Sequence, residues 1–93
     1  MILGSFNKQS AEVLDYDIDY SDWIDTTGDH VQSAAVTATP SDLVIDSVFV
    51  NDPRLKIWLA GGTSGTQYLI EVLMTSADGR IKRDEFKLKV KDI

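Results

Sequence analysis

The sequence predicts an all-β fold built as a sandwich of two sheets. Short runs of alternating apolar and polar residues recur along the chain, and turn-forming residues separate them at intervals of about ten residues. In addition, no segment longer than ten residues combines helical apolar spacing with capping residues. Such a pattern is typical of a β-sandwich of the immunoglobulin or fibronectin type III kind, and we expect six to seven strands.

Alternation is most regular in VLDYDIDYS, residues 13–21. Because successive side chains of a strand point to opposite faces, one face of this strand should be apolar and aromatic and the other acidic. The apolar face would carry Leu14, Tyr16, Ile18 and Tyr20, and the acidic face Asp15, Asp17 and Asp19. We therefore predict a half-buried strand with a wetted outer side.

Three further runs fill the middle of the chain. Residues 31–38 are small and β-branched and lead into the turn Thr39-Pro40-Ser41-Asp42. The next predicted strand, residues 43–50, ends at Asn51-Asp52-Pro53. Residues 54–60 follow, and their alternation places Leu55, Ile57 and Leu59 on the inward face.

The last two strands flank a turn at Ser76-Ala77-Asp78-Gly79, where Gly79 can supply a positive φ. Residues 67–74 are apolar on both faces except at Glu71, which favours a central strand. In residues 86–90, Phe86, Leu88 and Val90 should point inward. The polar run at residues 82–85 is out of phase with Ile81, so we expect a bulge or a protruding hairpin end there.

Composition limits what such a domain can be. Ninety-three residues make one domain, which we place at residues 11–93. The absence of cysteine excludes disulfides and thiolate metal sites. No apolar stretch approaches the roughly 20 residues of a membrane span, and the start MILGSFNKQ lacks the features of a signal peptide. We therefore expect no membrane partner and synthesis in the cytoplasm.

Charge is distributed unevenly. Residues 1–52 carry ten acids and one lysine, whereas residues 53–93 carry eight bases and five acids, so that −9 and +3 give the net charge of −6. An acidic surface repels phosphates, which argues against nucleic-acid binding. The asymmetry favours either simple solubility or a subunit whose unlike ends attract each other in an assembly.

The glycine-rich segment WLAGGTSG, residues 58–65, invites comparison with phosphate-binding loops. No lysine stands where a P-loop needs one, and Gly61, Gly62 and Gly65 do not have the dinucleotide-binding spacing. Glycines that accept positive φ, together with hydroxyl side chains, suit a chain reversal. We interpret this segment as a loop between two strands.

Other candidate chemistry is equally weak, and we predict no catalytic, cofactor-binding or metal-binding residues. Asp15, Asp17 and Asp19 resemble the start of a calcium loop, but they lack its glycine and its glutamate and would point outward from an extended strand. The loop aspartates Asp22, Asp25 and Asp29 could hold an ion weakly, although nothing specifies one. His30 is the single histidine, and zinc needs more ligands. Trp23 and Trp58 suit either a carbohydrate platform or lids on the core.

Three segments resemble one family: EVLDYDIDYSDWI, WLAGGTSGTQYLIEVLMTSADGR and FKLKV. They are similar to the fiber-tail adaptors of tailed bacteriophages, small immunoglobulin-like structural proteins, over residues 11–90. The matching features are the pairs Asp15-Tyr16 and Ile18-Asp19, Ser21, Trp23, Trp58-Leu59, Gly61-Gly62-Thr63, Gly65-Thr66, Tyr68 and the turn from Thr75 to Arg80.

The resemblance implies a non-enzymatic virion protein that acts in several copies. Its partners would be other virion proteins, and it would link the tail or neck to the receptor-binding fiber. The main alternative is an immunoglobulin-like module of an adhesin that recognises carbohydrate or another cell-surface ligand, and a small enzyme is a more distant one.

Residues 1–10 precede the first regular strand and contain the apolar residues Ile2, Leu3 and Phe6. This segment is expected to be either an edge strand of the domain's own sheet or an arm that docks on a neighbouring virion protein. In the second case it would add backbone hydrogen bonds to an open sheet edge. The three apolar residues are therefore the predicted interaction residues.

Overall fold

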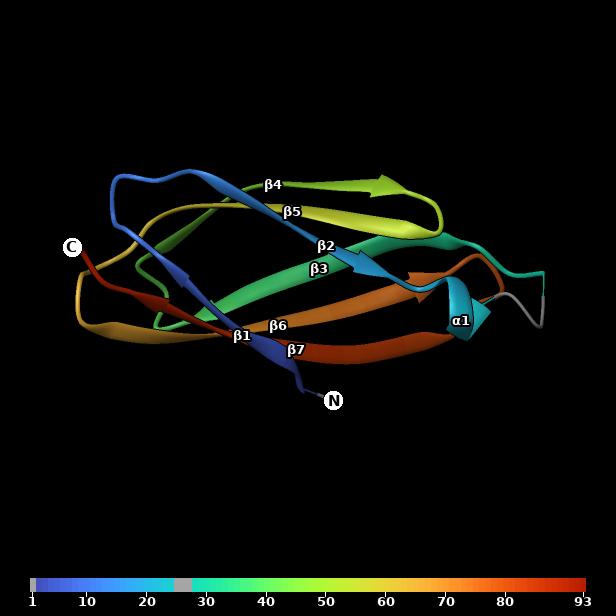
Figure 1. Ribbon diagram of the computed structural model, residues 1–93. Helices are drawn as coiled ribbons and strands as arrows, with labels where there is room; N and C mark the ends of the chain where they lie inside the picture. The colour runs from blue at the N-terminus through green and yellow to red at the C-terminus, as the bar shows by residue number, and fades with distance from the viewer. Residues whose placement is uncertain (1, 25–27) are drawn as a thin grey trace.

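The computed structural model describes residues 2–24 and 28–93, which contain seven strands and one short helix (Figure 1). Ile2 is described by its backbone alone. The elements are β1 (Ile2–Lys8), β2 (Leu14–Asp19), α1 (Ser21–Ile24), β3 (Val31–Thr39), β4 (Leu43–Asn51), β5 (Arg54–Gly61), β6 (Thr66–Ser76) and β7 (Ile81–Val90). The all-β prediction is confirmed.

The strands form two layers. A four-stranded sheet has the order β1-β7-β6-β3, and a three-stranded sheet has the order β2-β5-β4 (Figure 1). Every pair of neighbours is antiparallel except β1 and β7, which run parallel from Ile2↔Glu85 to Lys8↔Val90. The first and last strands of the chain therefore lie side by side, and β6 is the central strand that its composition predicts.

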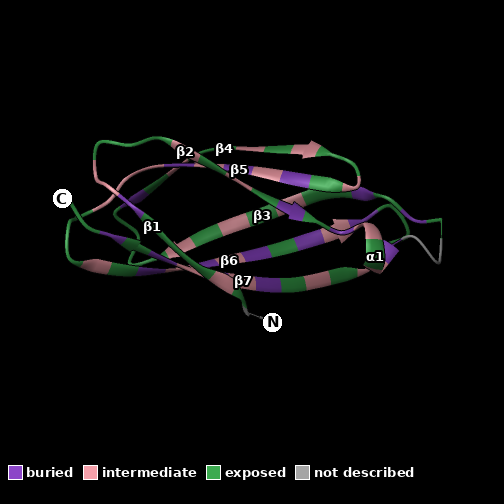
Figure 2. Ribbon diagram, in the orientation of Figure 1, coloured by how far each residue is buried: buried purple, intermediate pink, exposed green. Residues whose placement is uncertain are grey.

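The core lies between the two sheets. The inward residues of β5 are fully buried, as the alternation predicts, and so is every second residue of β6 from Tyr68 to Met74 (Figure 2). On β7 the same face carries Phe86, Leu88 and Val90. Because each strand places one face on this core, the period-2 pattern is sufficient to identify most of the buried residues.

The bulge or protruding hairpin end predicted for the polar run at residues 82–85 is wrong. β7 pairs with β6 from Ile81 to Val90 without a register shift. Asp84 is in phase with Phe86 and only 1% exposed, while Lys82 Nζ lies 3.0 Å from Asp84 Oδ1. Pairing allows the carboxylate to be buried, so the strand stays regular and Ile81 is left on the outer face.

The chain reversals predicted at residues 76–79 and in the glycine-rich segment are confirmed. At the β6–β7 hairpin Gly79 has φ +89°, and its N–H donates to the Ser76 carbonyl at 3.0 Å. The glycine-rich segment is the connection from β5 in one sheet to β6 in the other. In that connection the Tyr68 hydroxyl accepts a hydrogen bond from Thr63 N (2.8 Å) and donates one to Asp42 Oδ2 (3.0 Å), which holds the loop against the turn before β4.

α1 is a single turn that covers one end of the sandwich. It follows β2 directly, where Asp19 Oδ1 accepts a hydrogen bond from Ser21 N at 2.9 Å. Ile24 is buried and Trp23 packs on the core. The Arg80 guanidinium carbon lies 4.1 Å from the centroid of the Trp23 ring. Trp23 is therefore a lid on the core, and one of its faces is occupied by Arg80. No helix in the described part of the chain is long and apolar enough to cross a membrane.

Candidate functional site: the open side of the sandwich

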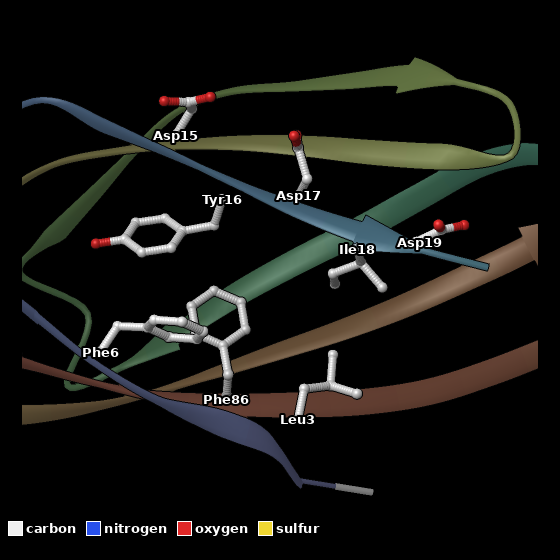
Figure 3. A pocket seen from close by; sticks show the side chains of 8 residues that line it. All are labelled: Leu3, Phe6, Asp15, Tyr16, Asp17, Ile18, Asp19 and Phe86. Carbon is white, nitrogen blue, oxygen red and sulfur yellow. The ribbon is translucent and has the colours of Figure 1, made fainter. Parts of the chain in front are cut away.

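The two sides of the sandwich differ. On one side the edge strands β3 and β4 contact each other directly after the turn that joins them. On the other side a cleft of about 530 Å³ lies between the edge strands β1 and β2 (Figure 3). It is lined by Leu3, Phe6, Asp15, Tyr16, Asp17, Ile18, Asp19 and Phe86. We call this side of the molecule the open side.

Three aromatic rings span the gap between the sheets at the cleft. The Phe6 ring on β1 lies 5.4 Å from the Tyr16 ring on β2 and 5.7 Å, edge-on, from the Phe86 ring on β7. Tyr16 and Phe86 are 5.6 Å apart. Aromatic contacts of this kind stabilise by about 0.5–1.5 kcal/mol each beyond the area that they bury. The rings therefore hold the two edge strands together while one side of each remains accessible.

The predicted interaction residues belong to this surface in part. Leu3 and Phe6 line the cleft and are 38% and 43% exposed (Figure 3). The side chain of Ile2 lies outside the described part of the structure, and its backbone pairs with Glu85. Residues Ile2–Lys8 thus form a strand of the domain's own sheet and still present two apolar side chains to solvent.

Sequence reasoning did not identify the other apolar lining residues, Tyr16, Ile18 and Phe86, as part of a site. Their alternation predicted only that they point inward. Inward residues near an uncovered sheet edge face a cleft instead of a sealed core, and no local signal marks which edge is uncovered. The strand order supplies that information.

The acidic face of β2 forms the rim of the cleft. Asp15 and Asp17 point away from it, as predicted for the outer side (Figure 3). Lys56 Nζ on β5 lies 3.0 Å from Asp15 Oδ2 and 3.7 Å from Asp17 Oδ1. The hydrogen bond from Lys56 lowers the pKa of Asp15, and the same bond raises the pKa of Lys56. Acids of the first half of the chain are thus partly compensated by bases of the second half within one molecule.

A second hollow of about 430 Å³ continues the cleft toward α1. The two hollows share Leu3, Ile18 and Asp19, so that together they follow the length of β2. The second hollow extends to Trp23 and to the pair formed by Lys82 and Asp84. We call the cleft and this hollow together the groove.

Of the other residues considered for chemistry, Asp22 lines the second hollow, whereas His30 and Asp29 lie elsewhere and have structural partners. His30 Nδ1 lies 3.2 Å from Asp52 Oδ2, and Asp52 Oδ1 accepts a hydrogen bond from Val31 N at 2.7 Å. Asp29 is buried and pairs with Arg80. Asp25 lies outside the described residues. Among residues 2–24 and 28–93, no group of three or more His, Cys, Asp or Glu side chains is placed to hold a metal ion.

The two tryptophans lie in different parts of the molecule. Trp23 belongs to α1 and packs beneath Arg80. Trp58 alternates with the buried residues of β5, so it lies on the outer face of the three-stranded sheet, opposite Asp15 in the β2–β5 register. Lys56 Nζ is 6.0 Å from its ring. Trp23 lines the second hollow of the groove, whereas Trp58 lines neither hollow.

Comparison with known proteins gives one family. The family model described as podophage GP4 fiber-tail adaptor protein gp77 matches residues 8–89. The match begins at the end of β1 and extends to the penultimate residue of β7. A search of curated proteins finds no match.

Proposed function

Because this chain belongs to the podophage GP4 fiber-tail adaptor protein gp77 family, we propose that it links the phage tail or neck to the receptor-binding fiber through protein–protein contacts. The family name implies a structural role in the virion and binding to other tail or fiber proteins.

The open side of the sandwich carries this proposal. Leu3 and Phe6 leave apolar surface in water beside β1 and β2, which are edge strands of the two sheets formed by the described residues. Burying apolar surface is favourable by about 25 cal/mol per Å², and an uncovered strand edge offers backbone groups to a partner. A protein that docked here would cover both features at once. Protein contacts of this kind need no catalytic group, and we propose that the chain is not an enzyme.

We also propose that the sandwich is of the immunoglobulin-like kind. When the seven strands are lettered A to G in chain order, β2-β5-β4 is the order B-E-D and β7-β6-β3 is G-F-C. An immunoglobulin constant-type domain has these two groups, with strand A beside B. In the strand order of this chain, β1 instead lies beside β7. We further propose that several copies act together, as repeated contacts around a tail would require.

A charge placed at the groove tests the docking role. Leu3→Glu should lower the number of copies per purified phage particle several-fold, because it puts a carboxylate where a partner would bury apolar surface. The matched control is Leu73→Glu on the outer face of β6, because Leu73 is exposed to a similar extent, at 43%. Quantitative mass spectrometry of particles and the melting temperature of each purified variant are the two measurements.

The proposal fails if both variants enter particles at the wild-type level. If Leu3→Glu melts far below the wild type, Leu3→Ser replaces it, since serine removes the apolar contact without adding charge. A wild-type chain that is missing from purified particles would contradict the virion assignment itself.

A further inference from the structure

We propose that β2 is the strand edge at which the partner docks, and that the partner adds an extended segment in which basic and apolar residues alternate. This inference rests on the proposed adaptor function and specifies the chemistry of its partner. Three observations support it: the regularity of β2, the charge of its outer face, and the groove beside it.

Of the four edge strands in the described part of the chain, β2 alone has an uninterrupted register. β1, β3 and β4 each contain one residue more than the neighbouring strand, between Ile2 and Ser5, Val31 and Ser33, and Ile45 and Ser47 respectively. Such bulges disturb the row of backbone groups and protect an edge from further pairing. β2 pairs with β5 without a shift from Leu14 to Asp19. Its other side is the most regular template for an added strand.

The edge of β2 is protected from unwanted strand pairing by charge and not by a bulge. Asp15, Asp17 and Asp19 occupy its outer face, and like charges directly opposite each other on neighbouring strands are destabilising. The same carboxylates would attract a strand that carries lysine or arginine at the facing positions. They already accept such neighbours on the other side, where Lys56 pairs with Asp15 and Asp17, and Arg54 Nε lies 3.9 Å from Asp19 Oδ2. An added basic strand would repeat this arrangement.

The residues between the basic ones would enter the groove. Tyr16 and Ile18 alternate with the aspartates and point toward the cleft (Figure 3). A strand beside β2 would have the same alternation, so every second side chain would face Leu3, Phe6 and the other apolar lining residues. Apolar side chains fit that surface, whereas charged side chains would lose their hydration there.

A second copy of this chain does not have the required edge. Within the described residues, the four edge strands contain a single base, Lys8, which is 2% exposed and donates from Nζ to the Gly61 carbonyl at 2.7 Å. The bases of β5 and β7 lie on interior strands. Pairing two β2 strands would set aspartates against aspartates. The occupant is therefore a different protein.

The place beside β2 corresponds to the place of a strand in immunoglobulin domains. In constant-type immunoglobulin domains strand A lies beside strand B, and here the corresponding place beside β2 is left open because β1 pairs with β7. The partner segment would fill it and extend the three-stranded sheet to four strands. β-Strand addition of this kind gains affinity from backbone hydrogen bonds and specificity from alternate side chains.

The test uses the full chain, labelled with ¹⁵N, and a synthetic peptide of alternating lysine and valine that is long enough to span β2. We expect amide shift changes concentrated at Leu14–Asp19 and at Phe6, and weaker binding at higher salt. The control peptides carry glutamate in place of lysine, or the same lysines and valines in separate blocks. Absence of binding by the alternating peptide at concentrations up to about 1 mM, or equal binding by all three peptides, would overturn the proposal.

Two charge reversals make the test specific. Asp17→Lys on β2 should weaken peptide binding about tenfold, and Asp46→Lys on the edge strand β4 should leave it within about twofold. If Asp17→Lys perturbs the fold, Asp17→Asn replaces it, because asparagine keeps the shape of the aspartate. The peptide affinity of Asp17→Asn should lie between that of Asp17→Lys and that of the wild type. Equal effects of Asp17→Lys and Asp46→Lys would contradict docking at β2. The number of wild-type copies per particle separates the adaptor function from docking at β2. If the chain is present in particles but does not bind the peptide, docking at β2 is contradicted and the adaptor function is not.

Discussion

Arg80 Nε donates to Asp29 Oδ2 at 3.1 Å, and this contact ties the β6–β7 hairpin to the segment that leads into β3. Asp29 Oδ1 also accepts hydrogen bonds from His30 N (2.8 Å) and Asp78 N (2.9 Å). Burial by itself would raise the pKa of Asp29, but the hydrogen bonds from Ser76, these two amides and Arg80 outweigh it and hold the pKa well below its usual value. The ionised carboxylate is therefore a structural centre of this end of the sandwich.

This pKa shift predicts an acid-sensitive fold. Because the folded-state pKa is lowered, the contribution of Asp29 to stability is complete above its unfolded pKa of about 3.9 and is lost as pH falls toward the folded value. The melting temperature of the wild type should therefore fall below about pH 4 more steeply than that of Asp29→Asn. At neutral pH the variant should melt roughly 5 °C or more below the wild type. Melting followed by circular dichroism at a series of pH values measures both effects.

The control for this experiment is Asp46→Asn on the outer side of β4. It should melt with the wild type across the whole pH range. If Asp29→Asn and the wild type lose stability in parallel on acidification, another carboxylate controls the acid limb.

Two glycines with similar φ should respond differently to alanine. Gly62 and Gly79 have φ +94° and +89°, but a Cβ on Gly62 would lie 2.8 Å from Val90 Cγ2, whereas one on Gly79 would have no atom within 4 Å. Gly79→Ala should lower the free energy of unfolding by about 1 kcal/mol from the backbone conformation alone. Gly62→Ala should lower it by about 2–4 kcal/mol, because overpacking of a buried, β-branched side chain is added. Urea unfolding measures the free energy of unfolding of both variants. Equal losses of stability would show that the loop moves away from Val90 at little cost.

The hydroxyl of Tyr68 should matter more than that of Tyr20. Both tyrosines are buried, but Tyr68 Oη has two hydrogen-bond partners, Thr63 and Asp42, whereas Tyr20 Oη has none within the described residues. Tyr68→Phe should therefore lower the free energy of unfolding by about 1–3 kcal/mol. Tyr20→Phe should leave it unchanged or raise it, because it removes a buried hydroxyl. Urea unfolding of the two variants side by side makes the comparison, and a larger loss for Tyr20→Phe would contradict it.

Calcium should not stabilise the protein. The aspartates of β2 point outward along an extended strand and are paired with Lys56 and Arg54, so they do not converge on a common point as calcium ligands must. The melting temperature should be the same in millimolar calcium and in a chelator. A rise of many degrees with calcium, reversed by the chelator, would mean that a cation site exists on the folded chain.

Much of the fold could be predicted from local pattern. The inward residues of β5, the central place of β6 and the hairpin at Gly79 followed from alternation and turn chemistry, because both depend on residues close together in the chain. The spacing of the glycines before Tyr68 likewise excluded a phosphate-binding loop. The prediction failed at residues 82–85 because Asp84 is buried and pairs with Lys82, and the Lys82 ammonium also lies 5.9 Å from the ring of Trp23, a residue far away in sequence.

The candidate site was less accessible to such reasoning. Leu3 and Phe6 were identified as apolar residues outside the regular pattern, but the pattern could not decide which strand they would join. By itself, the sequence determined which face of each strand is apolar and that the outer face of β2 is acidic. The tertiary structure decided that β1 pairs with β7 and leaves β2 at an open edge beside the groove. The physical reason is that a side chain's direction is set by its own backbone, whereas the neighbour of a strand is set by contacts over the whole chain.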